Sequence, residues 1–232
     1  MKRLIDRTQH CYWEYSQEDC TLVLSGCGTL PDLLVASEQE DQSESRVFLD
    51  VPWREHIGEI EQIVFSGDIP IIPNGAFWNT PQLKKVVAPN VSLIGNGAFY
   101  LCKNLKDIEI EELVAICEAS FDGCSSLRTL KKPKGRLNFK ADKLRFIGRS
   151  AFSNCCSIAD ISLDYAESIG DYAFFNCKNL KTVRLKNASQ IGRAAFFGCE
   201  QLVSIELREG ATIGEKAFER ASGVSLTYLL TE

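Results

Sequence analysis

The stretch IGDYAFFNCKNLKTVRL at residues 169–185 is followed closely by IGRAAFFGCEQLVSIEL at residues 191–207. Both copies place isoleucine, glycine, alanine, phenylalanine, cysteine and leucine at the same spacing, and the second copy begins 22 residues after the first. A fixed period of roughly 20 to 50 residues indicates a chain built from similar stacked units. The fold therefore follows from the content of one unit.

The same spacing extends over most of the chain. Seven isoleucines mark it, and a phenylalanine follows each of them five residues later. The isoleucines are Ile72, Ile94, Ile116, Ile147, Ile169, Ile191 and Ile213, and the phenylalanines are Phe77, Phe99, Phe121, Phe152, Phe174, Phe196 and Phe218. One interval has 31 residues instead of 22, which predicts an insertion of nine residues in the third unit.

Each unit is predicted to form one coil of a solenoid. Its tail, with Leu180, Val183 and Leu185 in one copy, alternates apolar and polar residues and predicts a short strand with one buried face. Repetition in register makes the strands of successive coils parallel, about 4.8 Å apart. The glycine after the isoleucine, as at Gly170, suits a corner where a Cβ would not fit. The alanine and phenylalanine then point inward, so stacked coils bury a core that no single coil could close.

The pattern IGxxAFxxCxxLxxIxL resembles that of the BspA-like leucine-rich repeat family. The resemblance covers nearly the whole chain from about residue 20, because CTLVLSGCGTLPDLL (20–34) and VPWREHIGEIEQIVF (51–65) look like the β-rich N-terminal cap of such proteins. It implies binding rather than catalysis, and an extracellular or cell-surface role in many bacterial members.

We therefore expect one continuous domain with an α/β leucine-rich-repeat solenoid fold. The solenoid should be right-handed, with parallel strands on one face and short helical or 3-10 turns on the other. Residues 1–65 should form the N-terminal cap and first strand, and residues 66–232 the seven coils, with the insertion at about 131–145.

Composition narrows the functional classes. The 232 residues carry a net charge of −5, which argues against binding nucleic acid or a membrane surface through a basic face. No apolar run approaches the roughly 20 residues of a membrane-spanning helix. The start, MKRLIDRTQHCYWEYS, lacks the apolar segment of a signal peptide. Its absence favours the cytoplasm, whereas the family resemblance favours the cell surface if a signal was removed, so both compartments stay open.

Five cysteines occupy one position of the repeat, eight residues after the isoleucine. They are Cys102, Cys124, Cys155, Cys177 and Cys199, and Thr80 and Ala221 replace them in the first and last coils. A small residue is needed there, so we predict buried thiols in the core. Zinc sites usually contain a local pair such as C-x₂-C, which is missing here, and Cys11, Cys20 and Cys27 match no common zinc spacing. We expect neither a metal nor a cofactor.

The sequence offers little for catalysis. It contains no H-E-x-x-H, G-x-x-x-x-G-K-[ST] or G-x-S-x-G motif. Its two histidines, His10 and His56, both lie outside the coils, so no acid–base pair can be assigned within the repeat. We predict that the protein is not an enzyme.

Outward-facing strand residues form the first candidate binding surface. Two residues after the conserved leucine lie Gln62, Lys85, Asp107, Thr129, Asp160, Thr182, Ser204 and Leu226; four after it lie Val64, Val87, Glu109, Lys131, Ser162, Arg184, Glu206 and Tyr228. Solenoids commonly bind macromolecules on such a face, and we expect a protein partner there. The predicted contact residues are Val64, Lys85, Val87, Asp107, Glu109, Asp160, Thr182, Arg184, Glu206 and Tyr228. The alternative is that their β-branched and aromatic side chains only favour strand formation.

The insertion is the second candidate. KKPKGRLNFKADKLR at 131–145 has seven basic residues and one acidic residue, a charge of +6. The basic residues Lys131, Lys132, Lys134, Arg136, Lys140 and Lys143 would suit an acidic protein, an anionic glycan or phosphate groups. The alternative is a solvated hairpin that docks on the acidic stretch SEQEDQSES at 37–45. Lys132 replaces the core leucine of its strand, which predicts that the coil opens there.

The last strand, VSLTYLL at 224–230, completes the seventh coil. An uncovered apolar strand edge is a template for pairing with another chain. We therefore expect self-association through this strand, or a partner that covers it.

Overall fold

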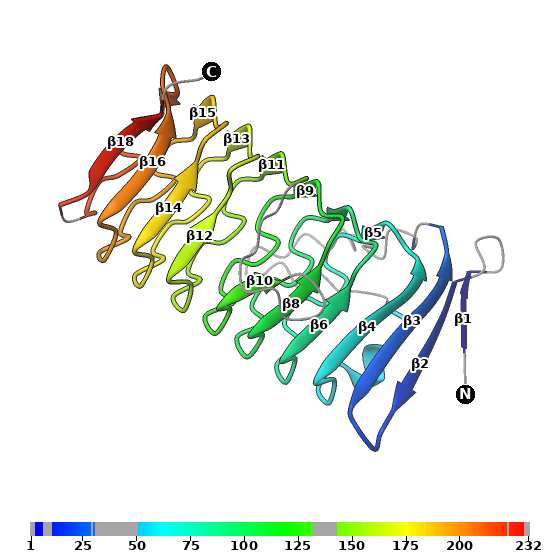
Figure 1. Ribbon diagram of the computed structural model, residues 1–232. Helices are drawn as coiled ribbons and strands as arrows, with labels where there is room; N and C mark the ends of the chain where they lie inside the picture. The colour runs from blue at the N-terminus through cyan, green and yellow to red at the C-terminus, as the bar shows by residue number, and fades with distance from the viewer. Residues whose placement is uncertain are drawn as a thin grey trace, which may run out of the picture.

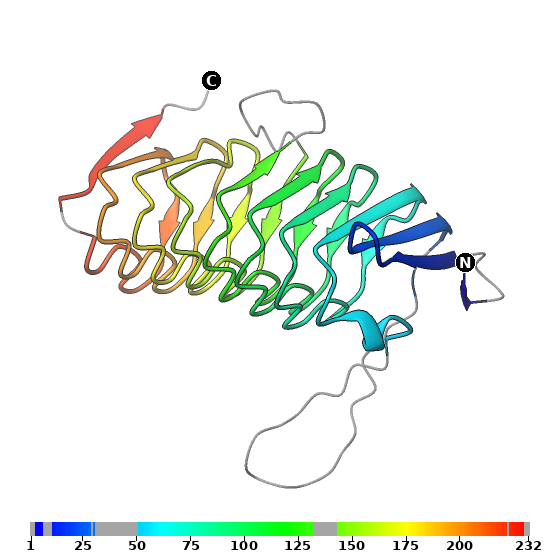
Figure 2. The ribbon, with the colours of Figure 1, turned by 90° about the horizontal axis from the view of Figure 1, so that it is seen from below.

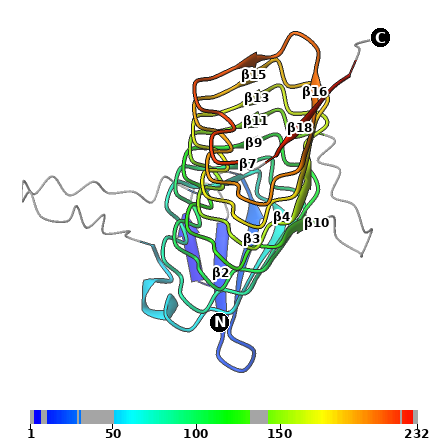
Figure 3. The ribbon, with the colours of Figure 1, turned by 90° about the vertical axis from the view of Figure 1, so that its left-hand side faces the viewer.

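A computed structural model of the chain describes residues 3–6, 11–28, 30, 51–131, 143–221 and 223–229. Within these residues the chain winds into a solenoid whose coils stack in one direction (Figure 1). The seven coils begin at the repeated isoleucines and are numbered in chain order from Ile72. The view along the solenoid shows the coils lying over one another (Figure 3).

Two rows of parallel strands run along the solenoid. The longer strands form the strand face: β4 (Gln62–Asp68), β6 (Lys85–Ala88), β8 (Asp107–Ile110), β10 (Thr129–Lys131), β12 (Asp160–Ser162), β14 (Thr182–Leu185), β16 (Ser204–Arg208) and β18 (Ser225–Leu229). Two-residue strands at the isoleucines form the second sheet: β5 (Ile71–Ile72), β7 (Leu93–Ile94), β9 (Ala115–Ile116), β11 (Phe146–Ile147), β13 (Ser168–Ile169), β15 (Gln190–Ile191) and β17 (Thr212–Ile213). Figure 2 shows the turns between the two rows along one edge of the molecule.

The N-terminal cap is an antiparallel hairpin. It consists of β2 (Cys11–Ser16) and β3 (Thr21–Cys27), with β1 (Arg3–Asp6) paired antiparallel to β2. Strand β3 pairs in parallel with β4, so the sheet of the cap continues into the strand face. A short 3-10 helix, η1 (Arg54–His56), precedes β4. The solenoid with a β-rich N-terminal cap, expected from the sequence, is confirmed.

The turns after each isoleucine differ from the expected helical or 3-10 segments. No α-helix is present in the described ranges, and a positive φ recurs three and seven residues after each isoleucine, as at Tyr172 (φ 57°) and Asn176 (φ 60°). The N–H groups of Tyr172, Phe174 and Asn176 donate to carbonyls of the next coil at 2.7–2.9 Å. A helix would use such N–H groups within its own turns, whereas here they join neighbouring coils.

The phenylalanines of the repeat form one continuous stack inside the solenoid. Successive ring centroids are 5.1–5.6 Å apart with interplanar angles of at most 17°. The insertion does not interrupt the stack, because Phe121 and Phe152 are 5.3 Å apart. At the N-terminal end the buried ring of Trp53 stacks on Phe77 at 5.4 Å. Trp53 therefore closes the aromatic stack on the side of the cap.

The insertion divides the strand face between the third and fourth coils. On the strand face, β4, β6, β8 and β10 belong to one sheet and β12, β14, β16 and β18 to another. The two-residue strands β5, β7, β9, β11, β13, β15 and β17 form a single sheet. Lys181 N–H donates to the carbonyl of Ala159 at 2.7 Å, but no corresponding bond joins Ala159 to Arg128 in the described part of the chain. The chain thus opens on the strand side at the insertion. Lys132, which predicted this opening, lies outside the described residues.

The strand of the last coil begins one residue earlier than the 22-residue period predicts, because Ser204 pairs with Ser225. Leu226 pairs with Ile205 and Tyr228 with Leu207, so both belong to rows that face inward in the preceding coils. The predicted outward placement of Leu226 and Tyr228 is wrong, because it assumed the full period of 22 residues. Thr227 takes the outward position instead, beside Glu206. Tyr228 is nevertheless 54% exposed at the edge of the sheet.

The corner glycines allow the coils to approach closely, and this requirement is testable at Gly170. A Cβ on Gly170 would lie 2.7 Å from the backbone nitrogen of Arg149 and the backbone carbon of Gly148. Side-chain rotation cannot relieve these contacts, so Gly170→Ala should lower the free energy of unfolding by about 1–3 kcal/mol in urea denaturation. In the control Gly58→Ala, nothing lies within 4 Å of the new Cβ. Equal losses in both variants would contradict this explanation.

Candidate functional site

The strand face holds the candidate binding residues in two outward rows. Strand pairing aligns Gln62, Lys85, Asp107 and Thr129 with one another before the opening, and Asp160, Thr182 and Ser204 after it; the second row contains Val64, Val87, Glu109 and Lys131, then Ser162, Arg184 and Glu206. Nine of the ten predicted contact residues, all except Tyr228, therefore lie in these two rows. The opening separates them into two groups.

The group before the opening combines an apolar strip with an ion pair. Val64 and Val87 are half-buried neighbours on β4 and β6. Lys85 Nζ lies 2.8 Å from Glu109 Oε1, and both side chains remain partly exposed. An exposed pair of this kind stabilises a protein by about 1 kcal/mol at most. Its main effect here is to hold two charged side chains beside the valines.

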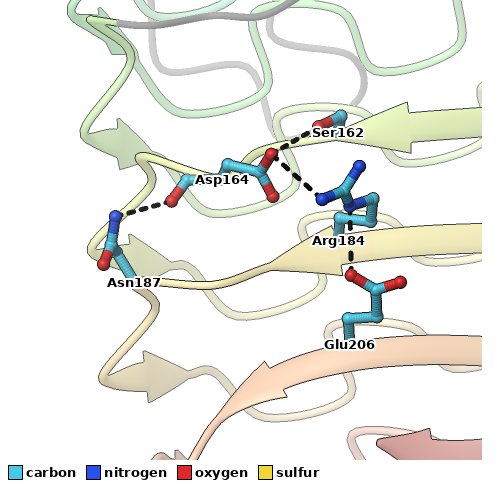
Figure 4. Close-up of polar contacts among 5 residues, drawn as sticks. All are labelled: Ser162, Asp164, Arg184, Asn187 and Glu206. Carbon is cyan, nitrogen blue, oxygen red and sulfur yellow. Dashed lines mark hydrogen bonds and ion pairs between the residues drawn. The ribbon is translucent and has the colours of Figure 1, made fainter. Parts of the chain in front are cut away.

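The group after the opening is organised by Arg184 on β14 (Figure 4). Its Nε donates to Glu206 Oε2 at 3.1 Å, and its Nη2 lies 3.7 Å from Asp164 Oδ2. Ser162 Oγ donates to the same oxygen of Asp164 at 3.2 Å. Asn187 Nδ2 donates to the carbonyl of Asp164 at 2.7 Å, so it joins the segments that follow β12 and β14. These contacts link three successive coils through side chains.

Sequence reasoning missed Asp164 and Asn187. Both lie just beyond the strands, outside the two rows that the alternation of the repeat identifies. A signal was nonetheless present, because Asn90 and Asn187 both precede a repeat isoleucine by four residues. Asn90 Nδ2 makes the equivalent bond to the carbonyl of Gly67 at 2.8 Å. The asparagine at this position therefore fastens each of these coils to the one before it.

The strand face after the opening is a fixed and acidic surface. Thr182 Oγ1 donates to Asp160 Oδ1 at 2.5 Å. This bond joins neighbouring side chains of the first outward row, as the bond from Arg184 to Glu206 does in the second row. The carboxylates of Asp164 and Glu206 flank the guanidinium of Arg184, and a third carboxylate, that of Asp160, accepts from Thr182 on the neighbouring strand. Asp164 Oδ1 is buried and accepts no hydrogen bond within the described part of the chain. The excess of carboxylates suits a partner with basic side chains.

The basic insertion is described only at its two ends. Lys131 lies on β10, and the Lys143 ammonium forms an ion pair with Glu112. Lys132, Lys134, Arg136 and Lys140 lie outside the described residues, as does the acidic stretch 37–45.

The cysteines of the repeat belong to the core, as the sequence predicted. Each thiol donates to the phenylalanine carbonyl of the preceding coil at 3.0–3.1 Å, as Cys177 does to Phe152. Burial raises the pKa of the Cys102 thiol to about 12, and it raises the pKa of Cys177 well above the usual range. Thr80 occupies the same position in the first coil, and its hydroxyl donates to the carbonyl of Phe77 within its own coil.

No disulfide joins any of the ten cysteines, all of which lie among the described residues. Cys11 is buried whereas Cys27, near it on the neighbouring strand of the hairpin, is exposed, so the two side chains lie on opposite faces. In the described ranges no group of three or more His, Cys, Asp or Glu side chains is arranged to hold a metal ion. The same ranges contain no helix that is long and apolar enough to cross a membrane.

Comparison with family models decides the classification. The model described as a BspA type leucine rich repeat region, with six copies, matches residues 55–163 and 136–229, most of the chain. The chain belongs to the BspA-type leucine-rich repeat family. The resemblance seen in the sequence is thereby confirmed, and the strand face and turns described above are those of BspA-type repeats.

Solved structures show the same fold. A leucine-rich repeat protein of T. pallidum is similar with a TM-score of 0.63 and 21% identity, over 96% of this chain and 91% of that one. A leucine-rich repeat protein from Bacteroides ovatus has a TM-score of 0.53 and 21% identity, over 74% of this chain. The match spans 55% of the B. ovatus chain, about half its length. None of the curated proteins that were compared matches this chain.

The buried thiols predict a loss of stability at alkaline pH. Thiols in an unfolded chain titrate near pKa 8.5, whereas those in the core stay protonated to higher pH. Above that pH the folded state holds more protons than the unfolded state, so the free energy of unfolding falls as pH rises from about 9 towards 12. Urea denaturation at pH 8 and pH 10.5 should show this fall, by up to about 1.4 kcal/mol per pH unit and thiol.

The variant Cys177→Thr tests the origin of this loss. It introduces the residue that the first coil uses at Thr80, so the hydroxyl can still donate while one buried titrating group is removed. The alkaline loss should be smaller than in the parent chain. Cys27→Ser, at an exposed thiol, should leave the loss unchanged. Identical losses in all three chains would rule out the buried thiols as the cause.

Proposed function

We propose that the chain is a non-enzymatic interaction module that binds a protein partner on its strand face. Leucine-rich repeat folds typically serve as binding modules. The observation that supports this face is the network around Arg184, in which outward side chains of three coils are held by one another. Side chains that are already ordered lose little conformational entropy when a partner binds.

The two groups of outward residues would contribute differently. The carboxylates near Arg184 would attract and orient a basic partner, because complementary charges mainly raise association rates and specificity. Val64 and Val87 would supply apolar contact area before the opening. We expect affinity to be concentrated in a few such anchors rather than spread over both rows.

A matched pair of threonines tests the choice of face. Thr182 and Thr212 are both exposed strand residues, but Thr182 lies on the strand face and Thr212 in the second sheet. A photo-crosslinking residue at position 182 should capture a partner from an extract of the source cells, and one at position 212 should not. Thr182→Arg should then weaken binding of the captured partner at least tenfold, with Thr212→Arg unchanged. Equal capture at both positions, or unchanged binding by Thr182→Arg, would overturn the proposal.

The alternative proposal is a carbohydrate- or anion-binding module that uses the basic insertion. The supporting observation is that the strand face opens between Lys131 and Lys143, at the two ends of this segment. Binding of a sulfated polysaccharide should then fall steeply as salt rises from 50 to 500 mM, because salt screens exposed charges. Lys131→Glu with Lys143→Glu should abolish it, and salt-independent binding would contradict this alternative.

We also propose self-association through residues 224–230. Among the residues that the structure describes, strand β18 pairs only with β16, and the five residues of β18 carry no charge. Uncharged edge strands favour pairing between chains, whereas a lysine on the edge opposes it. The 232-residue chain should therefore show a concentration-dependent mass in sedimentation equilibrium, and Thr227→Lys should shift it to the monomer. A parent chain that is monomeric at 100 μM would contradict this.

A further inference from the structure

A second surface of different chemistry lies on the turns of the fourth to seventh coils. Five side chains from four successive coils contact one another there, and we term them the turn-face ridge: Arg149, Tyr172, Phe175, Phe197 and Arg220. The ridge is separate from the strand face, because its residues lie in the turns between the isoleucine and the following strand.

The centre of the ridge is aromatic. The rings of Phe175 and Phe197 stack at 5.3 Å with an interplanar angle of 7°, and the Tyr172 ring meets Phe175 at 5.9 Å and 67°. All three side chains are half-buried, so part of each stays open to solvent. They form an apolar strip that continues from the fifth coil to the sixth.

The two ends of the ridge are cationic. Arg149 Cζ lies 5.8 Å from the centroid of Tyr172, and Arg220 Cζ lies 5.2 Å from that of Phe197. Both distances are within the range of a cation–π contact, about 6 Å. Such stacking orients a guanidinium while it leaves the N–H donors at its rim available.

These two guanidinium groups differ from the charged groups of Arg184 and Lys85 on the strand face. Arg184 is paired with Glu206 and Asp164, and Lys85 is paired with Glu109. Neither Arg149 nor Arg220 has an ion pair or hydrogen bond to its side chain within the described residues. Their charge and donors are therefore available to a carboxylate from outside the chain.

The repeat does not require the aromatic residues of the ridge. Phe175 and Phe197 lie six residues after the isoleucine, a position that holds Trp78 and Tyr100 in the first two coils but Asp122, Ser153 and Glu219 in the other three. Those coils stack equally well, with the ring of Phe121 5.4 Å from that of Phe99 in the core. The fold therefore accepts polar residues at this position, so stacking of the coils does not require the rings of Phe175 and Phe197.

We propose that the turn-face ridge binds an acidic peptide segment of a partner protein. Its carboxylates would pair with Arg149 and Arg220, and apolar side chains between them would pack on Phe175 and Phe197. Arginine and aromatic residues are the side chains most enriched at the energetic centres of protein interfaces. A carboxylate held by an oriented guanidinium accepts two parallel hydrogen bonds, which adds specificity to the attraction.

The geometry sets the spacing of the acidic residues. Arg149 and Arg220 belong to the fourth and seventh coils, and three steps at the spacing of parallel strands correspond to about 15 Å. An extended peptide rises about 3.3 Å per residue, so two acidic residues about five positions apart would span the ridge. The peptide GSELFSLEGS has this pattern, and GSQLFSLQGS is its uncharged counterpart.

The test measures binding of these two fluorescent peptides to the full chain by anisotropy. GSELFSLEGS should bind at least tenfold more tightly than GSQLFSLQGS, and its affinity should fall with salt. The double variant Arg149→Glu with Arg220→Glu should lose this binding at least tenfold. Arg208→Glu is the charge control, because Arg208 is exposed at the end of β16 on the strand face. This variant should bind the peptide as tightly as the parent chain does.

Three results would overturn the proposal: no preference for the acidic peptide, no loss in the double variant, or an equal loss in Arg208→Glu. Arg149 and Arg220 are exposed, so urea denaturation should show that the double variant is as stable as the parent chain. Replacing both by lysine keeps the charge but not the planar donor, and this variant should bind with intermediate affinity. Thr182→Arg should not affect binding of the peptide, which separates this inference from the proposed strand-face function.

Discussion

Hydrogen bonds that run along the solenoid axis are the constraint on which the rest of the structure depends. Each of the first six turns donates three backbone N–H groups to the next coil, and the strands on both sides add parallel ladders. No coil satisfies its own backbone, so each needs a neighbour at a fixed distance. The corner glycines, the buried phenylalanines and the small thiols are the residue types that keep this distance short. Residues with a positive φ, such as Tyr172 and Leu101, direct these N–H groups along the axis. Each such backbone conformation destabilises the fold by roughly 1 kcal/mol.

The sequence predicts most of this arrangement because the same pattern of residues occurs in seven copies. Its period places the strands, the core rows and the insertion, and alternation identifies which strand residues face outward. The backbone of the turns was not predictable from residue type, since Tyr172 and Leu101 are not residues that favour a positive φ. The missing residue in the last coil hid the register of Tyr228, and Trp53 stacks on Phe77 without belonging to the repeat. Each of these two features occurs only once in the sequence, so no second copy of the repeat reveals it.

The strand face and the turn face use charge in different ways. Arg184 is neutralised by carboxylates of adjacent coils, so its charge helps to fix a surface whose shape a partner would recognise. Arg149 and Arg220 rest on aromatic rings and keep their charge for an external group. A solenoid can carry both kinds of surface because substitutions in one row of the repeat leave the core rows unchanged. Binding properties can then vary along the chain without a change of fold.

The opening at the insertion has a mechanical consequence. Tension along the axis passes through every step between coils in series, so the step with the fewest connections separates first. Between the third and fourth coils the turn bonds and the second sheet remain, but the strand ladder is absent from the described residues. A pulling force would therefore divide the solenoid into the cap with three coils and a block of four coils before either block unravelled. A protein that links two bodies through its ends would thus have a defined point of extension.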